Sequence, residues 1–180
     1  MRLFIAAELP VEVREALAET SASLRDAVRG RYVGSDLFHV TLAFLGEVPS
    51  ARIGEIEALL AEATRGHAPF EVTLGPLGSF GRARRAVLWQ GFERGRDGLD
   101  ALAADVRASL AEAGFAFDGK GFLPHVTLMR EANLTGGSLP VPVVESGTLD
   151  TVTLFSSDLS GPRPRYEALA RVALTGTEDA

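Results

Sequence analysis

One four-residue string occurs twice in this chain of 180 residues and constrains its fold more than any other feature. His-Val-Thr-Leu begins at His39, within HVTLAFLG, and again at His125, within HVTLMRE. The offset between the copies is 86 residues (125 − 39), close to half of the chain. Around each copy the residue pattern predicts a helix, a strand and then a turn. The repeat therefore predicts two related lobes with a pseudo-twofold axis between them.

Strand-like and helix-like segments alternate along the chain. Apolar residues at helical spacing predict helices over residues 11–28, 51–63 and 98–113, the second of them capped by Ser50. Apolar runs and two-residue alternation predict strands over residues 3–8, 38–45, 70–74, 86–92, 123–129, 141–145, 148–155 and 166–174. Several strands follow one another directly, which favours an α+β fold with antiparallel sheets. We therefore expect a single bilobal domain over residues 1–180.

Composition places the chain among soluble globular proteins, since 46% of its residues are hydrophobic and 23% are charged. It contains no cysteine, which excludes disulfides, cysteine nucleophiles and thiolate metal sites. Glu8 interrupts the short apolar run near the N-terminus, so we interpret residues 3–8 as a strand and not as a signal peptide. No apolar run approaches the length of a membrane span. These features predict a cytoplasmic protein.

The formal net charge of −6 argues against a broad basic face of the kind that binds long nucleic-acid duplexes. An enzyme that acts on one terminal phosphate needs only a local basic cleft. Lys120 is the only lysine among 18 basic residues, so arginine supplies nearly all of the positive charge. Arginine suits phosphate contacts because its planar fork can donate to two oxygens at once.

Strand alternation gives each tetrad two different faces. Alternate side chains of a strand point to the same side. His39 and Thr41 therefore project together, as do His125 and Thr127, while the valine and leucine of each string face the other way. A single histidine in a strand is more often structural than catalytic. Here two of the three histidines of the chain lie in the repeat, which favours a catalytic pair.

Two such faces opposite each other match the requirements of cyclic phosphate hydrolysis. One histidine would take a proton from an attacking water, and the other, protonated, would give a proton to the departing ribose oxygen. Histidine can do both near neutral pH. In-line displacement needs acid and base on opposite sides of phosphorus, and a pseudo-twofold pair has this arrangement. The threonine hydroxyls and a nearby arginine could bond to the non-bridging oxygens.

The chain resembles the 2H phosphoesterases, and within them the bacterial RNA 2′,3′-cyclic phosphodiesterases, also called 2′-5′ RNA ligases. The resemblance covers nearly the whole chain. It rests on RLFIAAELP at the N-terminus, FHVTLAFLGEV and GFLPHVTLMR around the two tetrads, and FGRARRAVLW between them. The paired tetrads are the signature of the superfamily.

This resemblance implies a bilobal α+β fold with the active-site cleft between the lobes, and neither a metal ion nor another cofactor. It implies that His39 is the proton donor to the ribose 3′ oxygen and that His125 is the proton acceptor that activates water. The product would be a 2′-phosphate. Thr41 and Thr127 would bind the phosphate. The sequence itself does not distinguish the roles of the two histidines.

Arginines near the second tetrad are further candidates for substrate binding. Arg130 follows Leu128 by two residues, and we assign it by alternation to the face of His125, Thr127 and Met129. A second group lies in the loop before a predicted strand and comprises Arg82, Arg84 and Arg85. By the resemblance, Arg85 is the best candidate of the three, although a charged loop can also be merely solvated.

The positions of three other ring-bearing residues can also be predicted. Tyr166 could stack on a nucleobase or simply pack in the core. Phe44 has an odd offset from His39, so regular alternation predicts that it faces the core. His67 has no partner motif and is expected to be a surface or cap residue.

Three functions remain open. The first is an RNA 2′,3′-cyclic phosphodiesterase acting on RNA ends, tRNA fragments among them, with reversible ATP-independent 2′-5′ ligation as a side reaction. The second is a phosphodiesterase for small cyclic phosphates, such as cyclic nucleotides or ADP-ribose cyclic phosphate, which the acidic net charge favours. The third is a non-catalytic module that binds RNA ends. No heptads or broad apolar stripe indicate assembly, so we expect a monomer.

Overall fold

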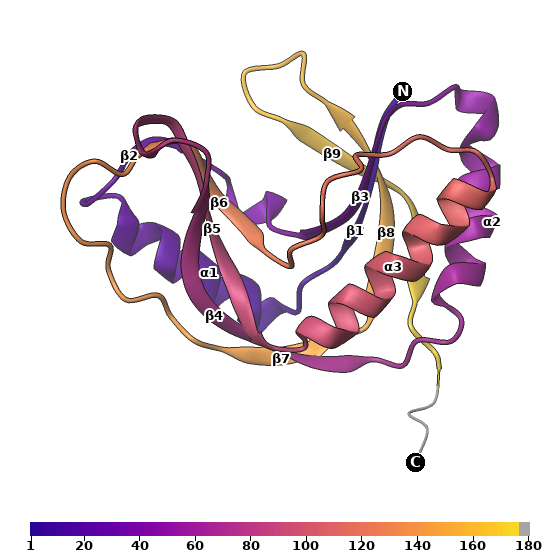
Figure 1. Cartoon of the computed structure of the whole chain (residues 1–180), viewed down its shortest axis with the longest axis horizontal. Helices are drawn as coiled ribbons and strands as arrows, with labels where there is room; N and C mark the ends of the chain where they lie inside the picture. The colour runs from indigo at the N-terminus through magenta and orange to yellow at the C-terminus, as the bar shows by residue number, and fades with distance from the viewer. Residues whose placement is uncertain (177–180) are drawn as a thin grey trace.

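Nine strands form two antiparallel sheets over residues 1–176, the part of the chain that the computed structural model describes (Figure 1). The first sheet has the strand order β3-β1-β8-β9. Its strands are β1 (Arg2–Ala7), β3 (Val40–Glu47), β8 (Thr151–Asp158) and β9 (Arg165–Ala173). The second sheet has the order β2-β6-β5-β4-β7. Its strands are β2 (Arg29–Tyr32), β4 (Phe70–Phe80), β5 (Ala86–Arg94), β6 (Val126–Asn133) and β7 (Ser146–Leu149). The predicted α+β class with antiparallel sheets is confirmed.

The helices divide unequally between the sheets. Helices α2 (Ile53–Thr64) and α3 (Arg96–Glu112) pack against each other and contact strands of the first sheet, while α1 (Val11–Leu24) contacts β7 of the second (Figure 1). The chain passes repeatedly from one sheet to the other: β1 belongs to the first sheet, and α1, the next element, packs on the second. The two halves are therefore interleaved and share one core.

The apolar backs of the tetrads are part of this core. Val40, Leu42, Val126 and Leu128 each have 0% of their surface exposed. Burial of a Val or Leu side chain stabilises a fold by about 1.5–3 kcal/mol. The face of each tetrad opposite its histidine is thereby fixed by packing.

Some predicted boundaries were wrong for identifiable reasons. Residues 141–145 are not a strand, because Pro140 and Pro142 cannot donate to a sheet; β7 begins only at Ser146. Strand β4 continues to Phe80 through a glycine-rich stretch that was predicted to be a connection. Glycine fits within this strand at Gly78 because the Trp89 ring occupies the space of a side chain there. Ser50 begins a short 3₁₀ turn and does not cap α2.

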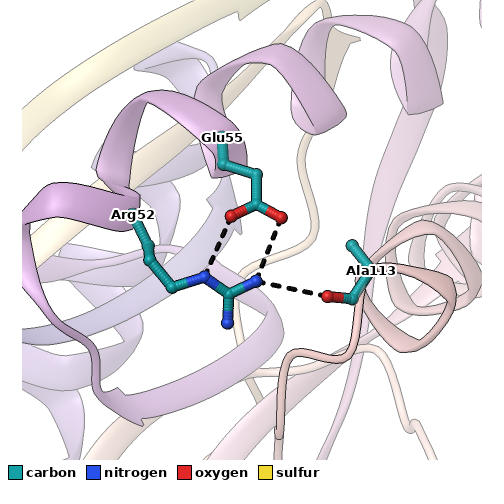
Figure 2. Close-up of polar contacts among 3 residues, drawn as sticks. All are labelled: Arg52, Glu55 and Ala113. Carbon is teal, nitrogen blue, oxygen red and sulfur yellow. Dashed lines mark hydrogen bonds and ion pairs between the residues drawn. The ribbon is translucent and has the colours of Figure 1, made fainter.

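Arg52 joins the beginning of α2 to the end of α3 (Figure 2). Its Nε and Nη2 donate to the two carboxylate oxygens of Glu55 at 2.9 and 3.0 Å, and Nη2 also donates to the carbonyl of Ala113 at 3.2 Å. The guanidinium carbon lies 3.7 Å from the centroid of the Phe115 ring. These contacts hold the end of α3, from which the chain runs on to His125.

No helix among the described residues has the length and apolar character needed to cross a membrane.

Candidate active site

Both tetrad histidines are held in the same way. Each immediately precedes its strand, His39 before β3 and His125 before β6. The Nδ1 of His39 lies 2.7 Å from the carbonyl oxygen of Leu37, and the Nδ1 of His125 lies 2.6 Å from that of Leu123. In both cases the acceptor is two residues earlier. Since a carbonyl can only accept, Nδ1 carries the proton and Nε2 is free to take one.

Each histidine is followed two residues later by a half-buried threonine, Thr41 or Thr127. The Nε2 of His39 lies 2.9 Å from the hydroxyl oxygen of Thr41. With Nδ1 protonated, that hydroxyl donates to Nε2. His39 and Thr41 therefore lie on one side of the strand, as alternation predicts, and are hydrogen-bonded to each other.

A β-bulge interrupts each tetrad strand at its leucine. In each strand, the threonine and the residue after the leucine pair with two successive residues of the neighbouring strand. The leucine between them has no pairing partner in that strand. Leu42 and Leu128 are therefore extra residues, and Ala43 and Met129 beside them are also buried. A bulge reverses the alternation of side chains beyond it. The next residue of each strand returns to the histidine face.

This bulge corrects two predictions. Phe44 does not face the core: it is 42% exposed and its ring centroid lies 5.8 Å from that of Phe4, which packs against His39. Arg130 is on the predicted face, but regular alternation does not explain it, because its offset of five from His125 would place it on the opposite face in a regular strand. The bulge returns Arg130 to the histidine face. Met129, expected on that face, is fully buried on the other.

Charges link the two tetrads although they lie in different sheets. Burial is the main reason that the pKa of His39 is lowered to about 4; the hydrogen bond to Leu37 opposes this shift, and the charges of Arg130 and His125 add to it. Burial also lowers the pKa of His125, with Arg130 again adding to the effect. Both rings are therefore neutral at pH 7 without substrate. Arg130 lies close enough to both to supply the local positive charge that the sequence predicted.

Aromatic rings surround both histidines. The centroid of His39 lies 5.0 Å from that of Phe4 and 5.6 Å from that of Tyr166. The centroid of His125 lies 5.0 Å from that of Phe80 and 5.8 Å from that of Trp89. These rings exclude water on one side of each imidazole. Sequence reasoning missed Phe4, Phe80 and Trp89, because an aromatic residue in a strand has no signal beyond that of a core residue.

The remaining candidates lie at different distances from the tetrads. Tyr166 is beside His39, and burial raises the pKa of its hydroxyl, with the charges of Arg130 and Arg2 acting against this shift. Arg85 forms an ion pair with Glu131, with Nη2 2.6 Å from Oε1, and its side chain is 77% exposed. His67 pairs with Asp105 of α3 at 2.8 Å and is not part of either tetrad. It follows the end of α2, and its side chain is 15% exposed, so it is partly covered and not a freely exposed surface residue.

Among residues 1–176, no three histidine, cysteine or carboxylate side chains gather closely enough to hold a metal ion.

Two histidine–threonine units on equivalent bulged strands of two antiparallel sheets define a phosphoesterase of the two-histidine class. A family model described as the 2′-5′ RNA ligase superfamily matches residues 9–137. The chain belongs to this family.

Two curated relatives match nearly the whole length of the chain. The RNA 2′,3′-cyclic phosphodiesterase of Escherichia coli (strain K12) is 38% identical over 175 residues, which are 97% of this chain and 97% of that protein. The protein of the same name from Thermus thermophilus is 33% identical and covers 98% of this chain, which spans 91% of its length.

Solved structures show the same fold. The crystal structure of E. coli LigT complexed with 3′-AMP has a TM-score of 0.84 at 35% identity, covering 97% of this chain and 98% of that chain. The crystal structure of TT0787 of Thermus thermophilus has a TM-score of 0.82 at 33% identity, covering 98% and 99%.

Proposed function

We propose that this protein is an RNA 2′,3′-cyclic phosphodiesterase that hydrolyses a terminal cyclic phosphate to a 2′-phosphate. The observation that carries the proposal is the matched pair of histidines, each with Nδ1 hydrogen-bonded to a carbonyl and Nε2 unprotonated, with Arg130 near both. The names of the relatives that match over the full chain support the substrate class.

In the proposed mechanism, His125 Nε2 takes a proton from water as the water oxygen attacks phosphorus. The bond between phosphorus and the ribose 3′ oxygen breaks, and protonated His39 Nε2 gives its proton to that oxygen. Water is consumed, and the products are a 2′-phosphate and a 3′-hydroxyl. Thr41, Thr127 and Arg130 would bind the non-bridging oxygens, where the transition state carries its charge. Arg85 and Tyr166 remain candidates for contacts with the rest of the substrate.

The donor role requires a proton that His39 does not hold at pH 7 in the free protein, since burial lowers its pKa to about 4. A bound phosphate brings a negative charge next to the ring and favours its charged form. The proton would therefore arrive with the substrate. The Thr41 hydroxyl, released from Nε2 when that nitrogen is protonated, could then turn to the phosphate.

Three finer expectations belong to this proposal. Reversal of the same chemistry would join RNA ends through a 2′-5′ linkage without ATP. The RNA would be a cytoplasmic fragment with a cyclic phosphate end, tRNA fragments among the candidates. The protein would act as a monomer.

His39→Ala and His125→Ala test the proposal on an oligonucleotide that ends in a 2′,3′-cyclic phosphate, with EDTA present. Loss of either general acid or base should lower kcat by about 10²- to 10⁴-fold. His67→Ala is the matched control, because it removes the third histidine without touching a tetrad. Phosphorus NMR of the product should show a 2′-phosphate. Near-normal turnover by either tetrad variant would rule out the assignment.

A second candidate is a phosphodiesterase for small cyclic phosphates, which the net charge of −6 favours. Equal kcat/KM for a cyclic mononucleotide and for a cyclic-ended oligonucleotide would support it. A purely RNA-binding module is less consistent with the site, since binding alone does not need two histidines with unprotonated Nε2 atoms.

A further inference from the structure

Arg31 lies directly opposite Arg130 in the second sheet. Strand β2 pairs with β6 so that Arg31 is the partner of Arg130 and Tyr32 is the partner of Met129. Directly opposed residues of antiparallel strands point to the same face. Met129 is buried, and the Tyr32 hydroxyl donates to the Val28 carbonyl at 2.8 Å, so this second pair lies on the core side. Arg31 and Arg130 therefore share the histidine face.

Two like charges directly opposite each other destabilise a sheet. The chain has 24 carboxylates against 18 basic residues, yet neither arginine forms an ion pair with any carboxylate of residues 1–176. Glu131, the next residue of β6, instead binds Arg85 with an Nη2–Oε1 distance of 2.6 Å. The charge of Arg31 also helps to lower the pKa of Glu131, after the larger effect of Arg85, so a carboxylate lies near Arg31 without forming an ion pair with it. Two opposed arginines with no ion pair of their own, at the edge of the histidine face, fit an anion supplied by the substrate.

The backbone holds Arg31 firmly at this position. A Cβ atom on Gly30 would lie 2.8 Å from the carbonyl oxygen of Glu131 and 3.0 Å from the Cα of Ala132. Only glycine permits this close approach of β2 to β6. The position of Arg31 beside Arg130 is thus fixed by the fold and does not depend on a flexible loop.

We infer that Arg31 binds the phosphodiester that precedes the terminal nucleotide, so that Arg130 and Arg31 hold two successive phosphates of one RNA strand. This inference rests on the proposed function and names its substrate class. A mononucleotide has only the reacting phosphate and leaves Arg31 unused. Arg31 would therefore distinguish an RNA end from a small cyclic phosphate although the net charge of the protein is −6.

The test compares Arg31→Gln with the unmodified protein on three substrates: a 2′,3′-cyclic mononucleotide, a cyclic-ended dinucleotide, and the same dinucleotide with a neutral methylphosphonate linkage. Loss of Arg31 should lower kcat/KM roughly tenfold on the charged dinucleotide, mainly through KM, and less than about twofold on the other two. The dependence of log kcat/KM on log salt should become shallower by about 0.7 on the charged dinucleotide alone. Arg31→Lys should recover part of the loss.

Arg65→Gln is the matched control, because it removes the same charge from the end of α2, where Arg65 pairs with Glu62. It should leave all three substrates unchanged. If Arg31→Gln does not fold, the unmodified protein still tests the idea, since it should prefer the charged dinucleotide over the methylphosphonate.

Two results would overturn the inference: equal losses on all three substrates, which would place Arg31 at the reacting phosphate, or no loss on any. Calorimetric binding of the corresponding 2′-phosphate products to the unmodified protein and to Arg31→Gln distinguishes a failure of this inference from a failure of the proposed function. If the protein has no turnover but Arg31→Gln still binds the charged product more weakly, only the proposed catalysis is wrong. If the protein turns over and Arg31→Gln behaves like the unmodified protein, only the second phosphate site is wrong.

Discussion

His39 and His125 share one hydrogen bond and differ in their surroundings. In each ring the Nδ1–H group donates a hydrogen bond to a carbonyl two residues earlier, which fixes the same tautomer in both histidines. His39 also accepts from Thr41 and lies among Phe4 and Tyr166, so charging it costs more. A donor that is hard to charge in the free protein gains its proton only where an anion lies next to it. Burial of His39 thus couples proton transfer to substrate binding.

The pKa of His39 can be followed directly by NMR of its imidazole protons. In the free protein it should titrate near pH 4, because burial opposes the charged ring. Saturation with a 2′-phosphate mononucleotide should raise this pKa towards or above the ordinary value of 6.5, since the phosphate charge favours the imidazolium. A free-protein pKa near 6.5, or one that ligand leaves unchanged, would contradict the coupling.

At the level of elements, the repeated bulge explains why the sequence predicted the histidines well and their neighbours poorly. Alternation placed His39 and Thr41 correctly, because both precede the bulge. It misplaced Phe44, because a bulge has no residue signature in HVTLAFLG. Arg31 was not singled out, since RGRY contains none of the apolar alternation that marks a strand. Strand identity followed from local pattern, whereas the pairing register depended on contacts between distant segments.

Arg107 of α3 connects the two tetrads. Its Nε donates to the carbonyl of Leu42, the extra residue of the β3 bulge, at 2.8 Å. Its Nη1 donates at 3.1 Å to the carbonyl of Lys120, in the segment that leads to His125. The guanidinium carbon also lies 5.3 Å from the centroid of the Phe122 ring. One side chain thereby holds the strand after His39 and the segment before His125.

Arg107→Met should disturb the site more than the fold. Two carbonyls lose a charged donor, so the free energy of unfolding should fall by about 2–3 kcal/mol. We expect kcat to fall about tenfold with little change in KM, because the histidines lose their alignment while the phosphate contacts remain. Urea unfolding and steady-state kinetics measure the two effects. Arg107→Lys, which can reach one carbonyl but not both, should recover part of kcat.

A purely structural role for Arg107 makes a different prediction. Activity would then fall only in proportion to the unfolded fraction, and kcat per folded molecule would stay constant. The shape of the pH profile would also stay constant, whereas misaligned histidines should change it.

At the level of the whole molecule, the interleaved chain turns a local repeat into one site. Helix α1, from the N-terminal half, packs on the second sheet. The first sheet contains the last two strands, from the C-terminal half, and α3 packs on it. The symmetry predicted from the tetrads holds for β3 and β6 and their bulges. It does not extend to the helices, because α2 and α3 both lie with the first sheet. Since both sheets contribute to one core, the two tetrads cannot separate without unfolding.

This shared core makes stability depend on the protonation of His39. Its pKa is about 4 in the folded protein and 6.5 in its ordinary state, so the unfolded chain binds more protons between these values. Unfolding free energy therefore falls as pH falls through this window. Each pKa unit corresponds to about 1.36 kcal/mol, which gives a loss of about 2 kcal/mol between about pH 7 and pH 4.5 from His39 alone. His125 acts in the same direction, since burial also lowers its pKa.

Urea unfolding of the wild type and of His39→Gln at about pH 7 and pH 4.5 isolates this contribution. Glutamine cannot titrate, so the variant should lose about 2 kcal/mol less than the wild type over the same interval. Measurements stop at about pH 4.5 because the lowered pKa values of exposed carboxylates such as Glu55 and Glu131 make stability fall further below that pH. Added salt should leave the difference intact, since burial and not a screened surface charge is its main cause. Parallel losses in the two proteins would mean that His39 charges without cost, and that the proton in the proposed reaction does not depend on the substrate.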